Sequence, residues 1–277
     1  VLYILHGFTD SDLAWMGWRE HFVNVPATME RALDAGTARE MILVMPNAFT
    51  AFQGSFYGSS VHTGDWERYV AEELVAYIDE HYRTIPERAS RGLTGHSMGG
   101  YGTLRIGMKR PDVFSSIYAM SPCCLAPSLE SGGGNTEQLR EIDTVEEVQG
   151  ADFFVKAAFA TAAAWTPDPS APPLYVDLGT GGEEERARAV ARRVANAPIA
   201  LLPQYIPELR SLTAIGLDSG AQDRGIVEGT RAMSVVLDEF GIEHFSEIYD
   251  PGDHINRVEE RVEEHVLPFF SRNLAFP

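Results

Sequence analysis

The chain has 277 residues, 44% of them hydrophobic, and is long enough to bury a large core. Its formal net charge of −18 argues against nucleic acid or an anionic membrane as a partner, because both require clustered cations. No apolar run approaches the length of a membrane span, so the sequence predicts a soluble protein. The cellular compartment stays open, since the chain opens abruptly at Val1 inside a strand-like run.

Short apolar runs alternate with longer amphipathic segments along the chain. The runs predict strands at 1–6, 41–46, 91–96, 115–121, 212–218 and 244–250. Between them, apolar residues recur at helical spacing over 66–82, 227–240 and 258–270. Strands separated by helices indicate βαβ crossovers. We therefore predict one α/β domain over residues 1–277, with a mostly parallel central sheet and helices on both faces.

One region interrupts this alternation. Roughly 90 residues separate the strand ending near Ser121 from the strand starting near Leu212, several times an ordinary connection. The segment holds helical patterns over 136–148 and 151–164, a proline-rich stretch and a charged helix-like run. Its apolar content argues against disorder. We predict an inserted lid or cap subdomain over 124–210; the alternative is an insertion remote from any site.

A serine motif lies where a predicted strand meets a predicted helix. Gly95-His96-Ser97-Met98-Gly99 fits G-x-S-x-G, in which a nucleophile on a sharp turn has strained backbone angles and needs small neighbours. The following helix would aim its free amides at a developing oxyanion, with the Met98 N–H as one donor. The strand-like "RGLTGH" and the helix-like "MGGYGTLRIGMKRP" supply the required context. The motif predicts that Ser97 is a nucleophile.

Such a serine needs a base, which three later histidines could supply. The chain order expected for this motif is serine, acid, histidine. His265 lies inside a predicted helix and His244 opens a predicted strand. His254 lies in "YDPGDHINRV", a loop between a strand and the last helix, at the sheet edge where ligands bind. We predict His254 as the base.

The acid and the second oxyanion donor are expected in two other loops. "TAIGLDSGAQDRG" offers Asp218 at a strand end and Asp223 in the loop beyond it. A carboxylate in the loop can reach the far nitrogen of the imidazole, which favours Asp223 as the acid; Asp218 is the alternative. In "LHGFTDSD" the Phe8 amide is the expected donor, with Thr9 as the second choice. His6 is expected to be a buried, hydrogen-bonded loop residue.

These residues together resemble an esterase family of α/β hydrolases. That family includes feruloyl esterase modules, S-formylglutathione hydrolases and the mycolyltransferases of the antigen 85 group. The resemblance spans nearly the whole chain, through "YILHGFTDSDLAW", "GSFYGSSVHTGDWERYVAEELVAYIDEHYRT", the extended serine motif, "LDSGAQD" and "DPGDHI". It implies the α/β-hydrolase fold and strengthens Asp223 as the acid. It also implies that Tyr57 and Trp66 line the substrate cleft, although aromatic residues there equally suit a core.

Two departures from the family stand out. Members have two further strands before the strand that opens this chain, so we expect either missing residues or a shortened variant. The "SGLTC" signature of the formylglutathione hydrolases is absent, which argues against that particular activity.

The sequence thus predicts a serine carboxylesterase that acts on a small-molecule ester, short-chain or aryl, through an acyl-enzyme. No cofactor is needed, and no metal-ligand spacing occurs in the sequence. An acyltransferase and a peptidase are alternatives on the same scaffold. A non-catalytic binding module is a further alternative, which the presence of all three triad candidates disfavours. The sequence does not indicate an oligomeric state.

The two cysteines of the chain, Cys123 and Cys124, are adjacent. Neighbouring residues rarely reach disulfide geometry without strain, so no disulfide framework is predicted. We expect both thiols to pack as small hydrophobic groups, with a place in the pocket lining as the alternative.

Overall fold

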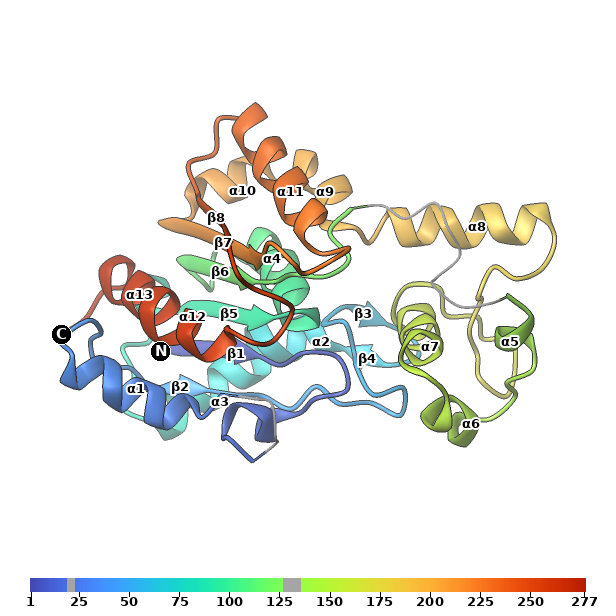
Figure 1. Cartoon of the computed structure of the whole chain (residues 1–277), viewed down its shortest axis with the longest axis horizontal. Helices are drawn as coiled ribbons and strands as arrows, with labels where there is room; N and C mark the ends of the chain where they lie inside the picture. The colour runs from blue at the N-terminus through green and yellow to red at the C-terminus, as the bar shows by residue number, and fades with distance from the viewer. Residues whose placement is uncertain (19–22, 127–135) are drawn as a thin grey trace.

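The fold is centred on a six-stranded parallel sheet. The computed structural model describes residues 1–18, 23–126 and 136–277 (Figure 1). The strand order is β2-β1-β5-β6-β7-β8, and every pairing is parallel. The strands are β1 (Leu2–Leu5), β2 (Leu43–Val44), β5 (Gly92–His96), β6 (Ser116–Met120), β7 (Ala214–Gly220) and β8 (Phe245–Tyr249). The predicted α/β class and the mostly parallel sheet are confirmed.

Helices cover both faces of this sheet. Successive side chains of a strand point to opposite faces, and here the side chains on both faces are apolar and buried. On β1, Tyr3 and Leu5 join one buried cluster, whereas Leu2 and Ile4 join the other. The first cluster packs under α3 (Leu74–His81), α4 (Met98–Lys109) and α11 (Val227–Glu239). The second packs under α1 (Val25–Asp34), α12 (Val258–Arg261) and α13 (Leu267–Asn273). Within the described residues, no helix is long and apolar enough to cross a membrane.

Several elements differ from the predicted ones. The predicted helix 66–82 is α2 (Trp66–Arg68), a π-helical turn (Tyr69–Glu73) and α3. The predicted helix 258–270 likewise contains a π-helical turn (Val262–Val266) between α12 and α13. Helix α1 and the hairpin β3 (Ser59–Ser60) with β4 (Gly64–Asp65) were not predicted. Single 3₁₀ turns lie at Asp12–Trp15, Arg88–Ser90 and Leu202–Gln204.

The predicted insertion divides into two parts. Helices α5 (Thr136–Arg140), α6 (Val145–Gly150), α7 (Phe153–Trp165) and α8 (Glu183–Val194) lie beyond the carboxyl ends of the strands, on the right of Figure 1. Helices α9 (Pro198–Leu201) and α10 (Ile206–Ser211) instead contact α4 and α11 in the main body. The projecting part is therefore narrower than the predicted 124–210. Residues 127–135 of that prediction lie outside the described residues.

Candidate active site

Ser97 lies on a strained turn between β5 and α4. Its φ of 57° and ψ of −115° place it in a region that side chains rarely occupy. The turn can form because its neighbours are glycines. A Cβ at Gly99 would lie 2.0 Å from the Leu5 carbonyl oxygen, and one at Gly95 would lie 2.6 Å from the Gly99 backbone. The sequence pattern thus dictates the local geometry that lifts Ser97 above the sheet edge.

Two loops bring His254 and Asp223 to this serine. Nε2 of His254 lies 2.9 Å from the Ser97 Oγ, and its Nδ1 lies 2.8 Å from Oδ2 of Asp223. Asp223 follows β7 and is buried, whereas His254 follows β8 and has a side chain 37% exposed. Parallel strands end at one edge, so three distant segments converge there. Such a chain of contacts can move a proton from a hydroxyl to an imidazole that a carboxylate holds in place.

Asp218, the alternative acid, lies elsewhere. It is fully buried within β7, and its Oδ2 accepts hydrogen bonds from Arg261 Nε and the Tyr118 hydroxyl, both at 2.8 Å. Burial raises the pKa of the Asp218 carboxyl, and Arg261 offsets only part of that rise. These partners make Asp218 a structural member of the β6–β7–α12 packing.

The remaining histidines singled out by the sequence have partners of their own. His244 lies 2.7 Å from the Ser234 hydroxyl and 2.9 Å from the Ile242 carbonyl. His265 lies 3.6 Å from Glu247. His6 is buried, with Nδ1 2.8 Å from the Gly7 carbonyl and Nε2 accepting the Ala48 amide at 2.8 Å. The His6 expectation is confirmed.

Sequence reasoning missed the role of His96, the residue before the serine. Its Nε2 donates to the His254 carbonyl at 2.7 Å, and the two imidazole rings lie 4.6 Å apart. Burial, and to a smaller extent the neighbouring His254, lower the pKa of His96 to about 3. His96 is therefore neutral and holds the loop that carries His254. Because this contact joins segments far apart in the sequence, no local sequence pattern indicates it.

The loop after β1 runs beside the serine. A Cβ at Gly7 would lie 3.6 Å from the Cβ of Ser97. The Thr9 amide already donates to the Gln53 carbonyl at 3.0 Å, whereas the Phe8 amide donates to no acceptor in the described parts of the chain. Met98 is the first residue of α4, so its amide has no acceptor within the helix. The Phe8 and Met98 amides, which follow Gly7 and Ser97 in the chain, are thus the candidate oxyanion donors.

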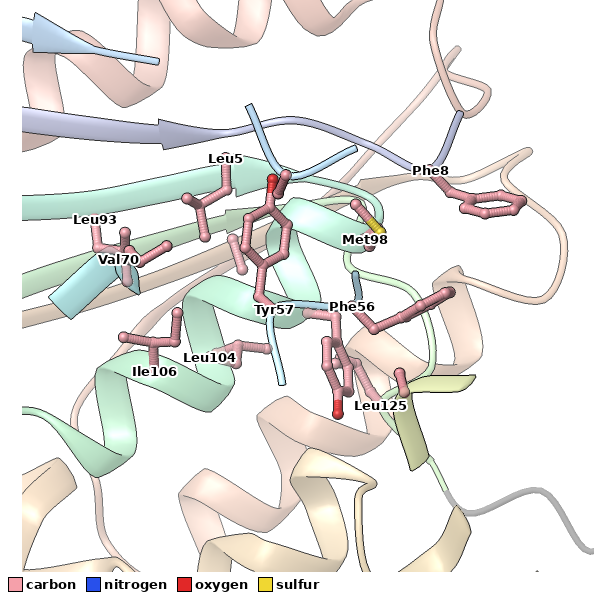
Figure 2. Packing of buried hydrophobic residues seen from close by; sticks show 14 of the residues in the cluster. Leu5, Phe8, Phe56, Tyr57, Val70, Leu93, Met98, Leu104, Ile106 and Leu125 are labelled. Atoms are coloured by element: carbon pink, nitrogen blue, oxygen red, sulfur yellow. The ribbon is translucent and has the colours of Figure 1, made fainter. Parts of the chain in front are cut away.

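The two aromatic residues predicted to line the substrate cleft have other contacts in the structure. Tyr57 is fully buried, and its hydroxyl donates to the His6 carbonyl at 3.1 Å. Its ring covers Gly102 of α4, and Figure 2 shows it inside the buried cluster with Leu104. Tyr57 is therefore a core residue that supports the β1 loop, which corrects the prediction. Trp66 is half-buried, and its contacts are with the Thr63 carbonyl and Tyr69. These contacts do not bring it to Ser97.

No metal site accompanies these residues in the described ranges, where no three His, Cys, Asp or Glu side chains gather as ligands. A cavity of about 610 Å³ lies at the opposite end of the sheet, beside Val1 and Ser90. It is lined by none of the residues at the serine.

A serine on a strand-to-helix turn, with histidine and aspartate on later loops of a parallel sheet, defines an α/β hydrolase. The family model described as "Putative esterase" matches residues 1–224. The chain belongs to this esterase family, as the motifs predicted.

Curated relatives share only part of their length with this chain. Esterase Rv1288 of Mycobacterium tuberculosis is 32% identical over 123 residues, which cover 44% of this chain and 25% of that protein. An endo-1,4-beta-xylanase/feruloyl esterase of Xylanibacter ruminicola is 27% identical over 115 residues, covering 41% of this chain and 15% of that protein. The chain thus matches a quarter or less of either relative.

Solved structures share the fold over nearly the whole chain. A ferulic acid esterase has a TM-score of 0.65 at 21% identity, covering 99% of this chain and 84% of that one. An S-formylglutathione hydrolase from Agrobacterium tumefaciens has a TM-score of 0.61 at 19% identity, with coverages of 99% and 84%. MPT51 of Mycobacterium tuberculosis has a TM-score of 0.61 at 16% identity, with coverages of 99% and 89%. These similarities concern the fold alone.

Proposed function

We propose that this chain is a serine carboxylesterase that hydrolyses carboxylic esters through a Ser97–His254–Asp223 triad. The observation that carries the proposal is the continuous contact from Asp223 Oδ2 through both ring nitrogens of His254 to Ser97 Oγ, at 2.8 and 2.9 Å. Membership of the esterase family supports the same reaction type.

In the acylation step, the Ser97 Oγ attacks the ester carbonyl carbon while His254 Nε2 accepts the hydroxyl proton. Asp223 accepts a hydrogen bond from the Nδ1–H of His254 and stabilises the imidazolium that forms. The carbonyl oxygen becomes an oxyanion, which the Met98 and Phe8 amides bind. The positive end of α4 favours the same negative charge.

In the second half, the tetrahedral intermediate collapses and His254 returns its proton to the leaving alkoxide. Ser97 then carries the acyl group as an ester. Water, deprotonated by His254, attacks that ester, and a second collapse releases the carboxylic acid and restores the Ser97 hydroxyl. No step requires a group beyond the residues named.

The proposed substrates are short-chain or aryl acyl esters. Aromatic side chains lie around the β1 loop, where Phe8 contacts both Phe56 and Phe153. The names of the relatives point in the same direction, since one is a feruloyl esterase. Methyl ferulate therefore belongs in the test beside a p-nitrophenyl series from acetate to dodecanoate.

The test compares wild type with Ser97→Ala on this panel. We expect kcat to fall by about 10⁴-fold or more in the variant, because the nucleophile is lost while the oxyanion donors remain. Ser219→Ala is the matched control, since the Ser219 hydroxyl is also buried and has no partner among the described residues. Its rates should equal those of wild type.

Equal rates in wild type and Ser97→Ala, or no turnover of any ester, would contradict the proposal. Repeating the assay with added alcohols separates hydrolysis from acyl transfer. Hydrolysis yields only the free acid, whereas transfer yields the ester of the added alcohol.

A further inference from the structure

The two adjacent cysteines lie in a segment that contacts the serine turn. They belong to the segment that leaves β6, and the Cys123 amide donates to the Ser97 carbonyl at 3.2 Å. Two residues on, the Leu125 carbonyl accepts the Ile199 amide of α9 at 3.1 Å. The cysteine segment therefore contacts both the serine turn and α9, the helix that follows the projecting part of the insertion.

The sulfur atoms of this pair touch. The Cys124 thiol donates to Cys123 Sγ at 3.0 Å. Consecutive side chains of an extended strand would point to opposite sides. Here Cys124 has a φ of 60°, a left-handed conformation that turns its side chain back toward Cys123. Cys124 is exposed and Cys123 is half-buried, so a reagent in solvent can reach the pair.

We propose that Cys123 and Cys124 form a thiol modification site that small disulfide oxidants convert to a vicinal disulfide. In the first step the Cys124 thiolate attacks one sulfur of the oxidant, forming a mixed disulfide and releasing one thiol. In the second, the Cys123 thiolate displaces the other half of the oxidant, and the Cys123–Cys124 bond closes. The pair loses two electrons and two protons, and one oxidant disulfide becomes two thiols.

The two cysteines suit this order of events. The hydrogen bond from Cys124, together with burial, raises the pKa of Cys123 well above its ordinary value, so exposed Cys124 meets the oxidant first. Closure needs the sulfurs to approach from 3.0 Å to the bond length of about 2.05 Å. A disulfide between adjacent residues is strained, and strained disulfides are readily reduced. The modification is therefore reversible by a dithiol.

Closure also changes the serine turn. The new bond closes a small ring through the peptide that joins the two cysteines, so the torsions of that peptide must change. The Cys123 amide, which holds the Ser97 carbonyl, belongs to the same segment. A displacement of about 1 Å at a catalytic group can cost about 10²-fold in rate. We expect ester hydrolysis to fall at least tenfold on closure; this part rests on the proposed function.

The test treats wild type with dithiodipyridine, which releases a coloured thiopyridone at each exchange step. Wild type should release two equivalents and lose the mass of two hydrogen atoms. Cys123→Ser and Cys124→Ser can each release only one equivalent and should keep the pyridyl adduct. Dithiothreitol should restore the mass and the activity of wild type, and Cys123→Ser capped with iodoacetamide at the exposed Cys124 should keep the uncapped rate.

A wild-type protein that retains a pyridyl adduct without closing the ring overturns the modification site. Ring closure with unchanged ester hydrolysis overturns its coupling to Ser97. Thiopyridone release and mass do not depend on turnover, so an absence of esterase activity would defeat the proposed function and leave the modification site to be judged separately.

Discussion

The two aspartates of the β7 segment are expected to respond in opposite ways to the same substitution. Asp223 contacts His254 at 2.8 Å, and Asp218 contacts Arg261 at 2.8 Å. Replacing either with asparagine removes one negative charge and hardly changes the volume. Asp223→Asn and Asp218→Asn therefore separate catalysis from stability within one segment, and each is the control for the other.

In Asp223→Asn, the amide no longer stabilises the imidazolium and favours the wrong tautomer of His254. The corresponding loss in a serine protease triad is about 10⁴-fold in kcat. In the resting protein, Asp223 contributes one hydrogen bond to the His254 ring. The free energy of unfolding should consequently change by no more than about 1.5 kcal/mol.

In Asp218→Asn, a buried guanidinium loses its fully buried partner. Breaking such a pair costs about 3 to 5 kcal/mol. Arg261 keeps its contact with Glu247 at 2.7 Å, and the Glu247 side chain is 37% exposed. We therefore expect the free energy of unfolding to fall by about 3 kcal/mol, the lower end of this range. The kcat of the folded fraction should stay within about threefold of wild type, since Asp218 contacts no triad residue.

The assay combines kcat on p-nitrophenyl acetate with urea unfolding followed by circular dichroism. The reasoning fails if Asp218→Asn is inactive while remaining as stable as wild type. It also fails if Asp223→Asn unfolds readily and retains its kcat. Either result would assign the acid to Asp218 and leave the contact of Asp223 with His254 without a function.

Two further predictions concern the serine motif. Gly99→Ala should abolish hydrolysis and lower the melting temperature, because its Cβ would lie 2.0 Å from the Leu5 carbonyl oxygen; Gly150→Ala, where nothing lies within 4 Å, should change neither. Folded His96 has a pKa of about 3 and stays neutral, while the unfolded chain gains a proton below about pH 6.5, so stability falls as pH falls. His96→Gln should reduce that slope by about 1.4 kcal/mol per pH unit in urea titrations between about pH 6 and 4, and an unchanged slope would contradict this.

The sheet and the serine turn were predictable because their signals are local. Strand β5 and helix α4 differ in period, and the glycines around Ser97 mark the turn between them. The order of strands in a parallel sheet then places later loops at the same edge. His254 and Asp223 could thus be selected from the sequence, and both lie within hydrogen-bonding distance of the predicted partner.

What could not be predicted depends on contacts between distant segments. The choice between Asp218 and Asp223 stayed open on spacing, since the partner of Asp218 is Arg261 on α12. Tyr57 was assigned to the cleft, yet it fills the space above Gly102 in the core. The sequence predicts a strand over 41–46, but β2 at the sheet edge has only two residues. An apolar run does not show how many of its residues pair with a neighbouring strand. Helix α1 had a usable signal, because Asn24 caps it and Pro26 stands in its first turn.

The projecting insertion meets the site at the first residue of α7. The Phe153 ring packs edge-on against Phe8, with centroids 5.5 Å apart, and remains 55% exposed. The Phe8 amide is one of the two proposed oxyanion donors, so Phe153 contacts a residue of the proposed oxyanion site. If the insertion acts as a lid, Phe153→Ala should lower kcat/KM about fivefold, corresponding to about 1 kcal/mol for an aromatic contact.

The effect should grow with acyl length, because longer chains reach further from Ser97 toward α7. Phe154→Ala is the matched control: its ring is 64% exposed and packs on Phe153. Its kcat/KM should stay within about twofold of wild type at every chain length. Equal losses in both variants would mean that the end of α7 acts only through stability. No loss in either would place the acyl chain on another side of Ser97, and the insertion would then have no part in selecting the substrate.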